Sequence, residues 1–111
     1  MKNNKLIAEF MELETKTFSS GIVNYYHQDI AEGSFFEDHE LSYNLSWDWL
    51  MPVVEKIESL GYEFTIVENR CKVSNNTDHS VKELFHIETI GSKIETTYDA
   101  VVQFIKKNKT I

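Results

Sequence analysis

The sequence has few of the residues that carry covalent chemistry or separate domains. It contains one cysteine, one proline and four glycines in 111 residues. Cys71 alone cannot form a disulfide within the chain, which fits a reducing compartment. So little proline and glycine leaves no flexible linker, and no repeat or low-complexity tract is present. We therefore expect residues 1–111 to form a single globular domain.

Long apolar runs are also missing. No stretch approaches the about 20 apolar residues that a membrane-spanning helix needs. The N-terminal segment starts with basic residues, but Glu9 and Glu12 interrupt the apolar stretch that a secretory signal requires. We therefore expect no membrane contact and a cytoplasmic location.

Positive charge is scarce, because 18 acidic residues stand against 11 basic ones and the net charge is -7. Repulsion from phosphates opposes general nucleic-acid binding, so we do not expect a nucleic-acid partner. The one basic cluster is Lys106, Lys107 and Lys109. We interpret it as the last turn of a helix, where positive charge complements the helix dipole.

Recognised catalytic and metal-binding motifs are absent, including a glycine-rich phosphate loop and the G-x-S-x-G turn. Residues 27–40 hold the densest set of ionisable groups, ending in Glu37, Asp38, His39 and Glu40. Carboxylates and imidazoles can bind divalent metal, but the spacing matches no known ligand pattern. We predict an acidic loop exposed to solvent, with no metal or other cofactor.

A thiol and an imidazole provide the second enzyme hypothesis. Cys71 and His86 fall in predicted strands that could be neighbours. Neither residue lies in a nucleophile turn, and a buried structural cysteine is much commoner than a catalytic one. We therefore predict no catalytic residues, and the sequence favours a non-enzymatic protein.

Three helices are predicted by apolar residues that recur at helical spacing. The first covers about residues 4–14 and is capped by Asn3 or Asn4. The last follows Ser92, which forms a capping box with Glu95, in which each side chain bonds the free backbone donor of the other residue. The middle helix begins after Ser46, contains a proline and stops at a glycine.

Two tryptophans begin the middle helix, and they project about 200° apart. Trp47 shares a face with Leu50 and Val54, so it is predicted to be buried. Trp49 lies at the margin of that face, where it either completes the core or contacts a partner. Trp49 is therefore the candidate interface residue.

Apolar and polar residues alternate at 62–66, 71–73 and 83–89, so each stretch is predicted to be a strand. Residues 74–80 are polar and predict a loop, with a surface turn at residues 78–79. Residues 21–27 predict a further strand, whereas the pattern of residues 28–44 favours no element. The expected class is α+β, a small, mainly antiparallel sheet of three to four strands packed with three helices. The expected order is α-β-α-β-β-β-α.

Three segments resemble a group of small phage and prophage proteins of gut and related bacteria, classed as a phage α/β/α-sandwich domain. They read NKLIAEFM at residues 4–11, SWDWLMPVVEKIE at 46–58 and TYDAVVQFIK at 97–106. The resemblance implies a phage or prophage origin, a bacterial host cell and a sandwich fold. It implies no established activity and no catalytic residues.

These expectations favour an accessory protein of a phage or prophage that acts through protein–protein contacts. Its partner would be another protein or a second copy of the chain. One alternative is an acidic anti-defence or regulatory protein that occupies a DNA-binding site on a host protein. The other is a small metal- or thiol-dependent enzyme.

Overall fold

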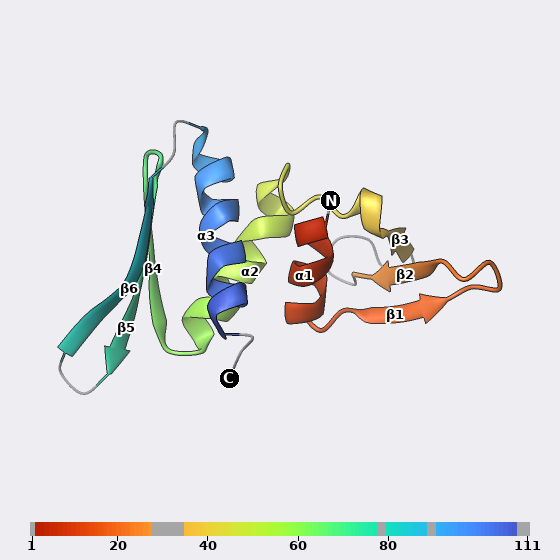
Figure 1. Cartoon of the computed structure of the whole chain (residues 1–111), viewed down its shortest axis with the longest axis horizontal. Coiled ribbons are helices and arrows are strands. Elements are labelled where there is room, and N and C mark those ends of the chain that lie inside the picture. Colours follow the sequence, from red (N-terminus) through yellow and green to blue (C-terminus); the bar gives the residue numbers. More distant parts are fainter. Residues whose placement is uncertain (1, 28–34, 78–79, 89–90, 109–111) are drawn as a thin grey trace.

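A computed structural model describes residues 2–27, 35–77, 80–88 and 91–108. Three helices lie between two antiparallel three-stranded sheets (Figure 1). The helices are α1 (Lys2–Phe10), α2 (Trp47–Ser59) and α3 (Lys93–Asn108). The N-terminal sheet has the strand order β1 (Glu14–Thr17), β2 (Val23–Tyr26), β3 (Phe35–Glu37). The C-terminal sheet has the order β4 (Tyr62–Val67), β5 (Arg70–Thr77), β6 (Ser80–Glu88).

The α+β class is confirmed, and the order of helices and strands is roughly as predicted, with two added strands and a second sheet. The single strand predicted at residues 21–27 is β2, the central strand of a sheet completed by β1 and β3. A short 3-10 helix, η1 (Asp38–Glu40), follows β3. The helices lie between the sheets, so the layer order differs from the α/β/α sandwich that the resemblance implies (Figure 1).

The helix ends show how local sequence sets the boundaries. At the start of α3, the Glu95 amide donates to Ser92 Oγ at 3.3 Å and the Ser92 amide donates to Glu95 Oε1 at 3.2 Å. This confirms the predicted capping box. Helix α1 ends at Phe10, earlier than predicted, because Glu12 adopts the left-handed conformation with φ 56° and turns the chain into β1.

The predicted polar loop at residues 74–80 is wrong. β5 continues through Thr77 and β6 begins at Ser80, so the polar residues extend the strands of a long hairpin. Backbone pairing satisfies the hydrogen bonds of this segment although its side chains are hydrophilic. The predicted surface turn at residues 78–79 lies outside the described residues.

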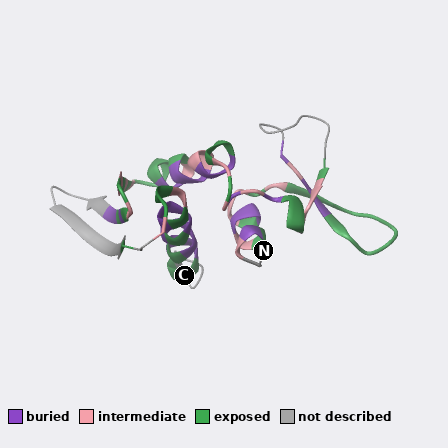
Figure 2. Ribbon diagram, turned by 90° about the horizontal axis from the view of Figure 1, so that it is seen from above, coloured by how far each residue is buried: buried purple, intermediate pink, exposed green. Residues whose placement is uncertain are grey.

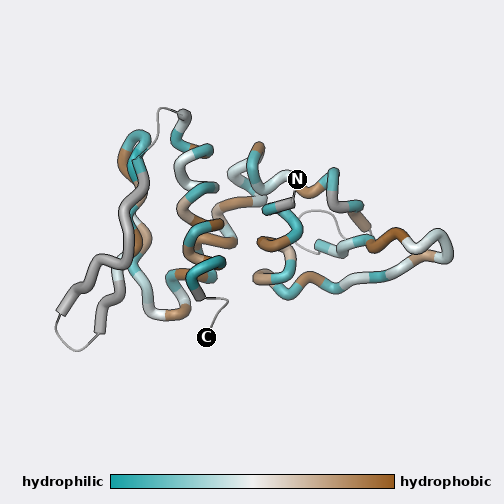
Figure 3. Tube along the Cα trace, viewed as in Figure 1, coloured by the Kyte–Doolittle hydropathy of each residue, from teal (hydrophilic) through white to brown (hydrophobic). Residues whose placement is uncertain are grey.

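One hydrophobic core joins all three helices to both sheets. Its buried residues face one another across the helices, whereas the hairpin of β1 and β2 is largely exposed (Figure 2). That hairpin projects away from the helices and carries hydrophobic residues near its tip (Figure 3). Within the described residues, no helix has the length and apolar character needed to cross a membrane.

A buried polar network centred on Asn4 connects α1 to two distant segments. Asn4, 1% exposed, donates through Nδ2 to the Leu41 carbonyl at 2.8 Å and to Asn44 Oδ1 at 2.9 Å. It also accepts a 2.8 Å hydrogen bond from the Tyr98 hydroxyl. Asn3 or Asn4 was predicted as the helix cap, but both lie within α1, and Asn4 links that helix to α3.

Candidate functional site

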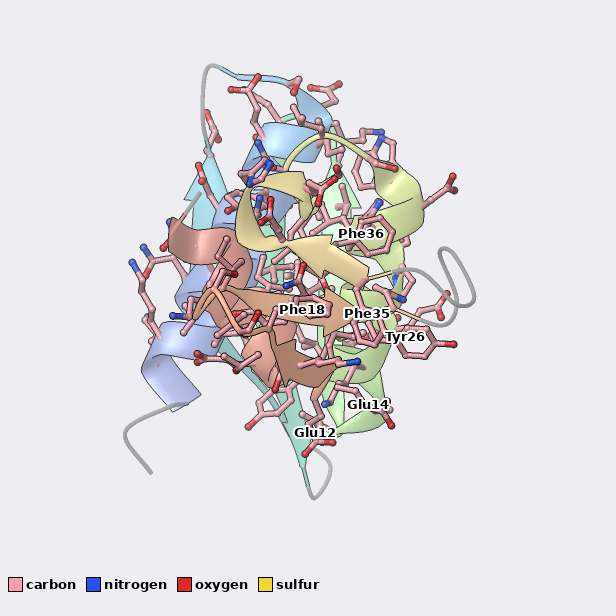
Figure 4. The ribbon with its side chains drawn as sticks, turned by 90° about the vertical axis from the view of Figure 1, so that its right-hand side faces the viewer. Glu12, Glu14, Phe18, Tyr26, Phe35 and Phe36 are labelled. Atoms are coloured by element: carbon pink, nitrogen blue, oxygen red, sulfur yellow. The ribbon has the colours of Figure 1, made fainter. Side chains whose placement is uncertain are left out.

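The outer face of the N-terminal sheet carries three aromatic side chains, of which two are exposed and one is half-buried. In the strand register, Tyr26 is aligned with both Glu14 of β1 and Phe35 of β3. Cross-strand partners share a face, so Tyr26 and Phe35 lie on the same side of the sheet. Phe18 follows the end of β1 and lies beside Phe35 (Figure 4).

Ring contacts hold these aromatic residues together as one surface. The centroids of Phe35 and Tyr26 are 5.4 Å apart, and those of Phe35 and Phe18 are 6.4 Å apart. Phe18 is 41% exposed and Phe35 is 40% exposed, so both rings are only partly covered. We call Phe18, Tyr26 and Phe35 the aromatic face. Grouped exposed aromatic rings are typical of protein contact sites.

The turn between β1 and β2 determines where Phe18 lies. The Gly21 amide donates to the Phe18 carbonyl at 2.8 Å, and the Phe18 amide donates to the Ile22 carbonyl at 3.0 Å. Gly21 has φ 84°, a conformation that glycine adopts without steric cost. Ile22 is 47% exposed and lies opposite Phe18, whereas Val23, 39% exposed, lies on the other face of the hairpin.

Charged residues of both signs border the aromatic face. Glu12 and Glu14 lie along one side of it (Figure 4). Lys16 Nζ lies 5.3 Å from the centroid of the Phe18 ring, a cation–π distance. The surface therefore combines an apolar centre with an ionic margin, as protein interfaces do.

The prediction that Trp47 is buried is wrong, whereas Trp49 completes the core, which is one of the two alternatives that the sequence left open. Trp49, the predicted interface candidate, is 7% exposed, whereas Trp47 is 37% exposed. The Trp49 ring makes edge-to-face contacts with three rings whose centroids lie 5.1–5.2 Å away, namely His27, Phe36 and Tyr43. These partners come from other segments, so the helical pattern alone could not reveal them. A ring this buried offers little surface to a partner.

Tyr43 lies in this ring cluster with a buried hydroxyl. The residue is 0% exposed, and its hydroxyl has no hydrogen-bond partner among the described residues. Burial raises the pKa of Tyr43 well above its ordinary value, so the hydroxyl stays protonated. A buried polar group without a partner lowers stability.

We expect Tyr43→Phe to raise the free energy of unfolding by about 1 kcal/mol, because it removes this unsatisfied hydroxyl. Tyr98→Phe is the matched control and should lower it, since the Tyr98 hydroxyl donates to Asn4. Denaturant unfolding curves measure both variants. A clear loss of stability in Tyr43→Phe would show that its hydroxyl is bonded.

Part of the predicted acidic loop forms a strand and a short helix. Residues 28–34 lie outside the described residues, but β3 and η1 account for residues 35–40. Glu37, His39 and Glu40 bring one ligand atom each within 4.8 Å of one another. His39 Nδ1 lies 3.6 Å from Glu37 Oε2, and the Glu37 amide donates to Glu40 Oε1 at 2.9 Å. Because His39 and Glu40 are exposed, the cluster is open to solvent.

The thiol–imidazole hypothesis finds no geometric support. The Cα partner of His86 is the exposed Lys72, whereas that of the buried Cys71 is Ile87. Cys71 Sγ lies 3.5 Å from Thr97 Oγ1. Burial raises the pKa of the Cys71 thiol, with a smaller opposing effect from the Thr97 hydrogen bond. A buried, protonated thiol is a poor nucleophile.

A groove near the start of α3 is lined by both polar and apolar side chains. Asn44 and Leu45 line one side, and Glu95, Tyr98 and Asp99 line the other. Desolvation, followed by the nearby Glu95 charge, raises the pKa of Asp99. The Glu95 carboxylate already serves the capping box, so the groove presents no preformed set of catalytic groups.

No protein-family model, curated protein or solved structure matches the chain. The candidate surface is therefore defined by the geometry of this chain. Sequence reasoning missed Phe18 and Phe35, although the segment TFSSGIV carries a usable signal. Apolar residues on both sides of a Ser-Ser-Gly turn are typical of a hairpin with an apolar tip.

Proposed function

We propose that this chain is a phage or prophage accessory protein that acts by binding a protein through the aromatic face. The single observation that carries the proposal is the exposure of Phe18 and Phe35 within one set of contacting rings. The resemblance to small phage proteins supports the origin, and a bacterial cytoplasm is the corresponding location.

The shape of the hairpin supports this role. β1 and β2 project from the helices, so the aromatic face is reached without any movement of the core (Figure 1). Aromatic rings contribute a large share of protein-binding energy because each buries much apolar area at low entropic cost. The residues that line this surface are not needed to fill the core, so a contact role explains why they are apolar.

An acidic protein that occupies a host DNA-binding site is the alternative proposal. Its support is the net charge of -7. Exposed acids occur on every helix and on both sheets, so the negative charge is not confined to one element. The two proposals differ in salt dependence, because contacts between exposed charges weaken with salt far more than apolar contacts do.

Affinity capture from bacterial lysate tests the proposal with matched variants. The double variant Phe18→Ser/Phe35→Ser removes the aromatic face, and Leu45→Ser/Leu60→Ser removes two exposed apolar side chains elsewhere (77% and 55% exposed). We expect the wild type and the control variant to bind the same proteins, and the aromatic-face variant to lose them.

Repeating the capture at about 0.5 M salt distinguishes the alternatives, because the Debye length there is only a few ångströms. Binding through the aromatic face should persist. Equal capture by the wild type and the aromatic-face variant would contradict the proposal, and loss of all binding at high salt would favour the acidic alternative.

A further inference from the structure

We infer that a second copy of the chain joins this one edge to edge along β1, beside the aromatic face, in an antiparallel arrangement. The inference rests on the proposed function, since it names the partner that the N-terminal sheet contacts. Three observations carry it: the open edge of β1, a self-complementary charge pattern along that edge, and the aromatic face beside it.

β1 is an edge strand, and among the described residues no strand pairs with its outer side. The register with β2 runs without a bulge from the Glu14–Tyr26 pair to the Thr17–Val23 pair. The Phe18 amide continues it by donating to the Ile22 carbonyl. In an antiparallel pair, alternate residues exchange hydrogen bonds with the partner strand. The backbone amide and carbonyl groups of Glu14 and Lys16 therefore bond β2, and those of Thr15 and Thr17 point away from β2.

Backbone amide and carbonyl groups that point away from the sheet on an edge strand can pair with another strand. In a dimer with twofold symmetry, hydrogen bonds form only where residues whose backbone groups point away from β2 lie opposite one another. Thr15 can oppose Thr15 of the other copy, Thr15 can oppose Thr17, or Thr17 can oppose Thr17.

The side chains select one of these three registers. With Thr15 opposite Thr15, Glu14 of each copy lies opposite Lys16 of the other, giving two pairs of opposite charge. With Thr15 opposite Thr17, Lys16 lies opposite Lys16, and the like charges repel. With Thr17 opposite Thr17, Lys16 lies opposite Phe18 and both charge pairs are lost. The Thr15-centred register is therefore favoured.

This arrangement would make one continuous antiparallel sheet from the two N-terminal sheets. Glu14 and Tyr26 are cross-strand partners on the outer side, so the charge pairs would form on the same side as the aromatic face. The two aromatic faces would then form one larger surface. Because β1 has only four residues, the pairing is short, and we expect a reversible dimer whose population rises with protein concentration.

Charge reversal on β1 tests the inference by sedimentation velocity over a range of concentrations. The wild type should sediment as a concentration-dependent dimer. Glu14→Lys and Lys16→Glu each place like charges opposite one another, so each variant alone should remain monomeric at concentrations where the wild type dimerises.

The decisive experiment mixes the two single variants and measures whether they form dimers. The Glu14→Lys chain then presents two lysines to the two glutamates of the Lys16→Glu chain, so dimers should return. The double variant Glu14→Lys/Lys16→Glu should also dimerise, because it exchanges the charges without changing their complementarity. Both positions are exposed, so folding should be unaffected.

A wild type that stays monomeric throughout, or single variants that dimerise as the wild type does, would overturn the inference. Failure of the mixture to restore dimers would also overturn it. Each of these results leaves the proposed function to be decided by the capture experiment, which uses Phe18 and Phe35 and a different readout. Loss of captured protein in the aromatic-face variant with a monomeric wild type would mean that the partner is a different protein.

Discussion

Replacing Trp49 with alanine should lower the free energy of unfolding by about 3–5 kcal/mol, the range found for large aromatic residues in cores. Trp49 is 7% exposed and contacts the rings of His27, Phe36 and Tyr43. Removing it leaves a cavity where α2 meets the N-terminal sheet and the segment before α2. The loss should therefore be severe, and it is measured by chemical denaturation.

Trp47→Ala is the matched control on the same helix. Because Trp47 is 37% exposed, its truncation should cost about 1 kcal/mol or less. Helical periodicity alone predicts the opposite order, with Trp47 as the core residue. A larger loss in Trp47→Ala than in Trp49→Ala would contradict the ring cluster described above.

Asn4→Leu should destabilise the protein by about 2–4 kcal/mol, because it removes a buried residue that satisfies three other groups. The Leu41 carbonyl, Asn44 Oδ1 and the Tyr98 hydroxyl would each lose a hydrogen bond of 2.8–2.9 Å. Leucine has a similar size, so the loss reports on the unsatisfied polar groups more than on a cavity.

Two further variants separate the polar network from general damage to α1. Asn3→Ala, at a half-buried neighbouring position, should have a much smaller effect. Adding Tyr98→Phe to Asn4→Leu should recover part of the stability, because the orphaned hydroxyl is removed. Equal losses for Asn3→Ala and Asn4→Leu would mean that the network contributes little.

The helices were predictable because each depends on local signals. Ser92 and Glu95 are three residues apart and bond each other across one helical turn, so their role is visible in the sequence. Gly61, with φ 99°, ends α2 as predicted. Lys106 and Lys107 lie in the last turn of α3 as expected, and Lys109 lies outside the described residues.

The N-terminal sheet was not predictable in the same way. β1 has the sequence ETKT, and all four residues are exposed. It therefore lacks the apolar alternation that identifies a half-buried strand. Its strand conformation comes from pairing with β2, which brings distant residues together and which no local pattern encodes.

The candidate site was missed for a related reason. Tryptophans are common at interfaces, but the exposure of Trp49 depends on Phe36 and Tyr43, which lie outside its helix. Phe18 and Phe35 are 17 residues apart in the sequence, and the pairing of β3 with β2 brings Phe35 to the hairpin that carries Phe18. Sequence reasoning therefore named Trp49 as the candidate interface residue, although Trp49 is buried and Phe18 and Phe35 are exposed.

Amide hydrogen exchange at Thr15, measured by NMR at low and high protein concentration, tests most directly whether the N-terminal sheet is the interaction surface. The Thr15 amide points away from β2, so it should exchange rapidly in the monomer and become protected as concentration rises. The Lys16 amide bonds β2 and should be protected at both concentrations. Association without added protection at Thr15, or protection that appears only in the helices and the C-terminal sheet, would contradict this account.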